Sequence, residues 1–133
     1  MKFRDARQAL RWFELWRGIG WLMIAVVLYL SLMPNPPSLD VSAGDKWSHA
    51  VGYACLMIWF AQLYARPVHW RVAAALIGLG VSIEFVQGMT DYRSFEYLDM
   101  LADAGGVVLG WWLGGTRFAS LLQRAERMAA ARN

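Results

Sequence analysis

Four apolar stretches constrain the fold of this chain more than any other feature. They cover about residues 18–33, 46–64, 72–88 and 98–117, and each approaches the ~20 residues that a helix needs to cross ~30 Å of hydrocarbon. The chain as a whole is 58% hydrophobic with a mean hydropathy of +0.32, whereas a soluble domain is usually about half apolar. We therefore expect an all-α membrane protein, a four-transmembrane-helix bundle that forms one domain over residues 1–133.

Basic amphipathic segments flank the four stretches. Residues 1–17 and 118–133 both alternate apolar and basic residues at helical spacing, which is typical of helices that lie on an anionic membrane surface. A signal peptide over the first apolar stretch is the competing interpretation, because residues 41–43 resemble a cleavage site. The three further apolar stretches favour a spanning helix instead.

The distribution of Lys and Arg predicts the orientation. All but two of the 13 basic residues fall in the N-terminal segment, the second turn or the C-terminal tail; the exceptions are Lys46 and Arg93. Since basic loops stay in the cytoplasm, both termini are expected inside, and the first and third loops outside. The net charge of +3 is modest, and the basic residues flank apolar runs rather than gather on a soluble face, so nucleic acid is not an expected partner.

Polar residues interrupt three of the apolar stretches at a similar depth. One helical face carries Asp45, His49 and Tyr53, a second carries Glu84 and Gln87, and a third carries Asp99, Asp103, Gly106 and Gly110. From the helical rise, His49, Glu84 and Asp103 each lie ~4–8 Å inside the outer boundary. Placing an ionised side chain at such a depth in the membrane costs ~3 kcal/mol of free energy, so each is expected to have a charge partner or a functional role. The pattern predicts one shared polar pocket that opens toward the outer head groups.

Single members of this set have simpler explanations. Asp45 and Asp99 suit helix caps, and the stem of Lys46 can run along apolar surface. Small-residue ladders on the third and fourth stretches are typical of close helix packing; they comprise Ala74 with Gly78, and Gly106 with Gly110 and Gly114.

The charges of the set do not balance. Four carboxylates, of Asp45, Glu84, Asp99 and Asp103, face only the two basic residues Lys46 and Arg93. Either a carboxylate is protonated, as burial favours, or a cation belongs in the pocket. The planar guanidinium group of arginine is able to bond two oxygens of a carboxylate or phosphate at once. Arg93 is therefore expected to turn inward and to bridge Glu84 or Asp99.

The spacing of these residues resembles a known family. The elements are Asp45-Lys46-x-x-His49-x-x-x-Tyr53, then Glu84-x-x-Gln87, then Arg93 followed by Asp99 and a Gly-rich end. Together they resemble the VanZ-like family of small integral membrane proteins over about residues 45–110. The family commonly carries Asn where this chain has Asp103. The resemblance implies a protein of the bacterial cytoplasmic membrane and cell envelope, in a family associated with resistance to the antibiotic teicoplanin, and it implies no particular reaction.

Three functions remain open from the sequence. The first is binding of an envelope lipid, a lipid-linked precursor or a glycopeptide antibiotic by its head group; the expected ligand-binding residues are Asp45, Lys46, His49, Tyr53, Glu84, Gln87, Arg93, Asp99 and Asp103. The second is an enzyme that uses His49 with Glu84 or Asp99 as acid and base, or a divalent ion held by such residues. The third is a structural partner in a membrane complex, including a homo-oligomer. No cofactor and no bound metal are expected, and the single Cys55 excludes an intramolecular disulfide.

Overall fold

The computed structural model describes residues 10–35 and 44–132. Within these ranges the chain forms five α-helices, two short 3₁₀ helices and no strand. The α-helices are α2 (Phe13–Leu32), α3 (Gly44–Leu63), α4 (His69–Gly88), α5 (Tyr97–Gly114) and α6 (Leu121–Ala130), and the 3₁₀ helices are η1 (Arg66–Val68) and η2 (Arg117–Ser120). The predicted all-α class is therefore confirmed for the described part of the chain.

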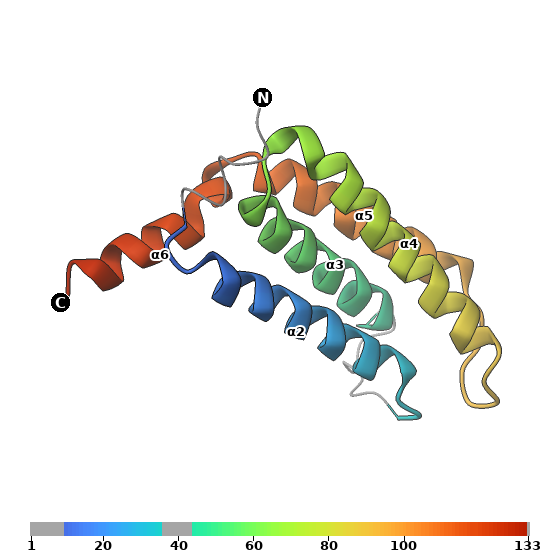
Figure 1. Cartoon of the computed structure of the whole chain (residues 1–133). Helices are drawn as coiled ribbons and strands as arrows, with labels where there is room; N and C mark the ends of the chain where they lie inside the picture. Colours follow the sequence, from blue (N-terminus) through green and yellow to red (C-terminus); the bar gives the residue numbers. More distant parts are fainter. Residues whose placement is uncertain (1–9, 36–43, 133) are drawn as a thin grey trace.

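The four long helices run up and down beside one another (Figure 1). Successive helices point in opposite directions, so the end of α2, the start of α3 and the α4–α5 turn lie at one end of the bundle. The start of α2, η1, η2 and α6 lie at the opposite end. Because this second end carries Arg17, Arg66 and Arg71, we name it the basic end, and we name the other the polar-cluster end.

The closest helix pair is α3 with α5, and glycines make the approach possible. A Cβ added at Gly106 would overlap the backbone oxygen of Ala50, and one at Gly110 would lie 2.5 Å from the backbone oxygen of Ala54. At Gly114 the added Cβ would come within 3.0 Å of the Ala61 side chain. The ladder expected on the fourth apolar stretch therefore lets the two backbones touch.

The ladder expected on α4 does not serve packing within this chain. Ala74 and Gly78 are both exposed, and a Cβ added at Gly78 would meet nothing within 4 Å. That prediction is wrong for the single chain, because α4 packs through its other side, where Ala73, Leu76 and Ile83 are buried. Spacing along one helix does not reveal which face meets the bundle.

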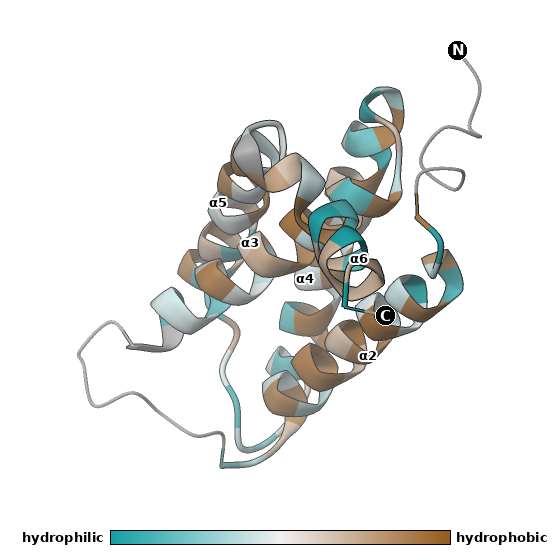
Figure 2. Ribbon diagram, turned by 90° about the vertical axis from the view of Figure 1, so that its left-hand side faces the viewer, coloured by the Kyte–Doolittle hydropathy of each residue, from teal (hydrophilic) through white to brown (hydrophobic). Residues whose placement is uncertain are grey.

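Large apolar side chains cover much of the outer surface. Leu22 on α2 is 63% exposed and Phe85 on α4 is 59% exposed, as are Leu101 and Val108 on α5 at similar levels. Figure 2 shows hydrophobic residues around α2 and hydrophilic residues on α6. By length and composition, Phe13–Leu32 and Arg66–Gly88 are able to cross a membrane. Core helices of soluble proteins pass the same test, so this finding is weak evidence for a membrane protein. It concerns two of the four expected spans.

The C-terminal helix holds the first helix at the basic end. One carboxylate, that of Glu126 on α6, accepts hydrogen bonds from the backbone N–H groups of Arg11 (2.8 Å) and Trp12 (2.9 Å) and from the indole of Trp16 (2.7 Å). The α6 backbone is in turn bonded to α3, because the Leu122 N–H donates to the Gln62 amide oxygen at 2.9 Å. These contacts tie α6 to both α2 and α3.

The helix boundaries differ from the sequence expectation at two places. Helix α2 begins at Phe13, so residues 13–17 continue into it, and the expected separate surface helix is wrong for them; residues 1–9 lie outside the described part. Helix α5 ends at Gly114 rather than near residue 117, since Gly114 and Gly115 are adjacent and glycine is a poor helix former. The expected tail helix is present as α6, after the intervening η2.

Candidate functional site

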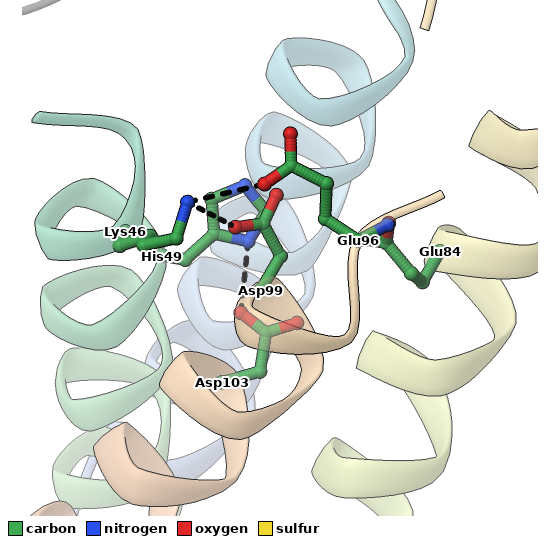
Figure 3. A network of polar contacts seen from close by, with 6 residues as sticks. All are labelled: Lys46, His49, Glu84, Glu96, Asp99 and Asp103. Carbon is green, nitrogen blue, oxygen red and sulfur yellow. Dashed lines mark hydrogen bonds and ion pairs between the residues drawn. The ribbon is translucent and has the colours of Figure 1, made fainter. Parts of the chain in front are cut away.

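Charged side chains from three helices meet at the polar-cluster end (Figure 3). They come from the start of α3, the end of α4 and the start of α5, as the sequence predicted from the matching depth of its polar residues. The polar cluster is defined here as Lys46, His49, Glu84, Glu96, Asp99 and Asp103. Tyr53 lies one helical turn further along α3 than His49.

The deepest charged contact joins α3 to α5. His49 Nδ1 lies 2.9 Å from Asp103 Oδ1, and the Asp103 side chain is only 3% exposed. Helix α4 comes close at this point, because a Cβ added at Gly80 would lie 2.6 Å from Asp103 Oδ2. Because Gly80 has no side chain, there is space beside it for the Asp103 carboxylate.

The buried carboxylate of Glu84 binds backbone. Glu84 is 1% exposed, and its Oε1 accepts the N–H of Glu96 at 2.5 Å. Glu96 is the residue that precedes the first turn of α5. The contact therefore fixes where the α4–α5 turn enters α5.

Lys46 joins the outer members of the cluster. Its Nζ lies 3.1 Å from Glu96 Oε2 and 3.6 Å from Asp99 Oδ1. The side chains of Lys46 and Glu96 are 38% and 47% exposed, whereas that of Asp99 is 13% exposed. The ammonium thus lies at the solvent-facing edge, with the carboxylate of Asp99 further in.

Two buried polar atoms have no hydrogen-bond partner within the described residues. They are the hydroxyl of Tyr53 and Oδ1 of Asp99. Tyr53 is 1% exposed, and its hydroxyl is near enough to Asp103 and Glu84 to interact with their charges. Since nearly all buried polar groups in proteins are hydrogen-bonded, a further hydrogen-bonding group is expected in the cluster.

Two predicted site residues, Gln87 and Arg93, stay out of this network. The amide of Gln87 donates to the backbone oxygen of Ser31 at 2.6 Å, which links α4 to α2. The side chain of Asp45 lies outside the described part, although its backbone belongs to α3. Arg93 makes no hydrogen bond or ion pair with the described residues, so the expected bridge to Glu84 or Asp99 is absent. Asp99 pairs instead with Lys46, which lies on α3, the helix that packs against α5.

Glu96 belongs to the cluster although the sequence analysis did not single it out. Its carboxylate pairs with Lys46, and its N–H binds Glu84. One signal was available: Glu96 lies three residues before Asp99, at the start of a helix, where carboxylates are favoured by the helix dipole. The direction of its side chain, however, depends on the turn from 89 to 96, which carries no periodic pattern.

The cluster is acidic and contains no recognisable metal arrangement. Its four carboxylates face one lysine and one histidine. No group of three His, Cys, Asp or Glu side chains within residues 10–35 and 44–132 is placed to hold a metal ion. The metal-assisted alternative therefore has no support from the geometry of these side chains.

Comparison of the chain with protein-family models, with curated proteins and with solved structures finds no match.

Proposed function

We propose that this chain is a VanZ-like protein of the bacterial cytoplasmic membrane, and that its polar cluster binds the head group of an envelope lipid or lipid-linked precursor. The observation that carries the proposal is the cluster itself. It places buried carboxylates and two unpartnered polar atoms at one end of a bundle whose outer surface is apolar. Such groups inside a membrane mark a functional site more often than a structural one.

The membrane part of the proposal, with four spanning helices, is supported by aromatic residues at both ends of the bundle. Exposed Trp12, Trp70, Trp111 and Trp112 lie at the basic end, and exposed Tyr29, Trp47, Tyr92 and Tyr97 lie at the polar-cluster end. Trp and Tyr are enriched at the two surfaces of a bilayer. Together with the asymmetry of the basic residues, this favours a cytoplasmic basic end and an outward-facing cluster.

A head group fits this position by depth and by charge. The cluster lies at the level of the outer head groups in the proposed orientation, so a lipid is able to reach it from the side without leaving the bilayer. Arg93 lies in the adjacent turn and has no charged partner among the described side chains, so it is available to a phosphate, which a guanidinium binds with two parallel hydrogen bonds.

Mass spectrometry of lipids that remain bound to the protein in mild detergent tests the proposal. We expect the purified wild type to retain lipid, and Glu84→Gln and His49→Ala to lose it while they still accumulate in the membrane. Asp91→Asn is the matched control, because Asp91 is an exposed acid on the same turn. If the two site variants fail to accumulate, the cluster holds the helices together and the proposal is wrong. Teicoplanin added to the same measurement tests a glycopeptide as the occupant.

A second candidate, acid–base catalysis on such a lipid, is favoured by the His49–Asp103 contact. A carboxylate on Nδ1 orients a histidine so that Nε2 faces the reacting group, as in hydrolase triads. We expect an enzyme of this kind to convert a fraction of an envelope lipid extract to product during incubation, and His49→Ala to abolish the conversion. An unchanged lipid profile with the wild type rejects this candidate and leaves binding as the function.

A further inference from the structure

We propose that the group recognised inside the polar cluster is a protonated primary amine on the lipid head group, and that Lys46 takes its place when no lipid is bound. This inference rests on the proposed function and specifies the chemistry of its ligand. It is argued from the polar atoms that lack partners, from the sign of the charges around them and from the position of Lys46.

The unpartnered atoms favour a hydrogen-bond donor. Asp99 Oδ1 is buried and accepts no hydrogen bond, and the hydroxyl of Tyr53 is buried and unpartnered as well. An ionised carboxylate only accepts hydrogen bonds, whereas an ammonium donates three and accepts none. A phosphate offers only acceptors and would face the carboxylates of Asp99, Asp103 and Glu84. The interior of the cluster therefore suits an ammonium and repels a phosphate.

The position of Lys46 supports this reading, because its Nζ is itself an ammonium at the edge of the cluster. It hydrogen-bonds to Glu96 at 3.1 Å but stays 3.6 Å from Asp99 Oδ1, beyond the usual hydrogen-bond distance of about 2.7–3.2 Å. Its side chain is 38% exposed, so it is free to swing outward. A ligand ammonium that hydrogen-bonds to Asp99 Oδ1 would replace the charge of Lys46 there.

The source of the amine is taken to be a lipid. The cluster lies beside apolar helix surface, since Phe85, Leu98 and Leu101 near it are exposed. Acyl chains on that surface would hold the head group at the right depth. Phosphatidylethanolamine is the simplest probe, since it combines a primary amine with a phosphate that Arg93 is free to meet.

The test compares lipids that differ only in the head group. The purified protein is mixed with equimolar phosphatidylethanolamine, phosphatidylcholine and phosphatidylglycerol, and the bound lipids are counted by native mass spectrometry. Phosphatidylcholine keeps the positive charge but has no N–H donor, and phosphatidylglycerol replaces the amine with hydroxyls. We expect phosphatidylethanolamine to be retained about tenfold more than either, as the loss of a charge-assisted hydrogen bond implies.

Substitutions at Asp99 or Tyr53 and at Lys46 should give effects of opposite sign. Asp99→Asn and Tyr53→Phe should abolish the preference for phosphatidylethanolamine, while Asp91→Asn should keep it. Lys46→Met removes the competing ammonium and keeps most of the apolar stem, so it should increase phosphatidylethanolamine retention. A lysine that binds lipid phosphate predicts a decrease instead, and that decrease would overturn the proposal.

The outcomes separate this inference from the proposed function. Retention of all three lipids to the same extent keeps head-group binding and rejects the amine. Retention of none rejects the amine inference, and the lipids that copurify with the wild type then decide the proposed function separately. If soluble glucosamine displaces phosphatidylethanolamine at equal concentration, the amine is recognised but its lipid origin is wrong. Thermal unfolding of each variant in the same detergent shows that it is folded when its lipids are counted.

Discussion

At the scale of single residues, Gly80 controls the contact between His49 and Asp103. A Cβ at this position would lie 2.6 Å from Asp103 Oδ2 and 3.2 Å from its Cβ. Because the carboxylate is enclosed by α3, α4 and α5, it has little room to move away. A methyl group there would push Asp103 off His49 or push α4 off α5.

We expect Gly80→Ala to destabilise the protein by about 1–3 kcal/mol, as overpacking of a core does, and to reduce lipid retention. Gly78→Ala on the same helix is the control, because nothing lies within 4 Å of its added Cβ. It should be neutral or stabilising by up to about 1 kcal/mol through helix propensity. Thermal unfolding in detergent measures both variants, and equal midpoints for the two would show that Asp103 has space to yield.

Only some of the site residues could be predicted from the sequence. His49, Glu84 and Asp103 were predicted to meet because regular helices carry them to one depth, and they do lie in one cluster. Arg93 and Glu96 follow no period, since both belong to the segment between α4 and α5. The direction of each side chain there depends on how Glu84 binds the turn, and local spacing does not contain that information.

At the scale of helices, the approach of α3 to α5 depends on single glycines. A Cβ at Gly106 would overlap backbone of Ala50, whereas one at the adjacent Gly105 would meet nothing within 4 Å. We expect Gly106→Ala to lower the unfolding temperature and membrane accumulation strongly, and Gly105→Ala to leave both unchanged or slightly higher. The unfolding midpoints of the two variants, measured side by side, check this. A tolerated Gly106→Ala would mean that the helices are able to separate at low cost.

The bonds of Glu126 make the docking of α6 depend on pH. Burial raises the pKa of this carboxyl, but the hydrogen bonds from Trp12, Trp16 and Arg11 outweigh burial and hold the pKa below its ordinary value of 4.5. A lowered pKa in the folded chain means that the carboxylate stabilises the fold fully above about pH 4.5. This contribution is lost as the pH falls through the lower, folded-state pKa.

We therefore expect Glu126→Gln to lower the unfolding temperature at pH 7 and to match the wild type at a pH well below 4.5. Glu14→Gln is the control, because Glu14 is exposed and, among the described residues, forms its ion pair with the nearby Arg17. Its difference from the wild type should be small at both pH values. A Glu126→Gln difference that persists unchanged into acid would show that the charge of the carboxylate is not what docks α6.

The sequence largely predicted which segments form helices, but it did not predict which helices pack against one another. The apolar runs predicted α2, α3, α4 and α5 because burial and helical hydrogen bonding act along a continuous stretch. The contact of Glu126 with Arg11 spans 115 positions, and it joins two segments that were each interpreted as surface helices on lipid. Similarly, Gly78 and Gly106 look alike in sequence, and only the packing of the whole bundle distinguishes them.

At the scale of the whole molecule, the proposed orientation is testable by cysteine labelling. In a Cys55→Ser background, a cysteine introduced in the 35–42 segment should react with a membrane-impermeant maleimide in intact cells. A cysteine at Ala130 on α6 should react only after permeabilisation, since it lies at the basic end. Labelling of both sites in intact cells, or of neither, contradicts a chain with four spans and a cytoplasmic basic end.

The contact of Glu126 with the start of α2 also has a consequence for biosynthesis. The ribosome makes α2 first, yet the carboxylate that accepts the N–H groups of Arg11 and Trp12 belongs to α6. Until α3, α4 and α5 have been made, those two amides have no protein partner of this kind. A nascent chain stalled before residue 126 therefore lacks this anchor at the start of α2, although Gln87 on α4 is able to hold the other end of α2 through Ser31.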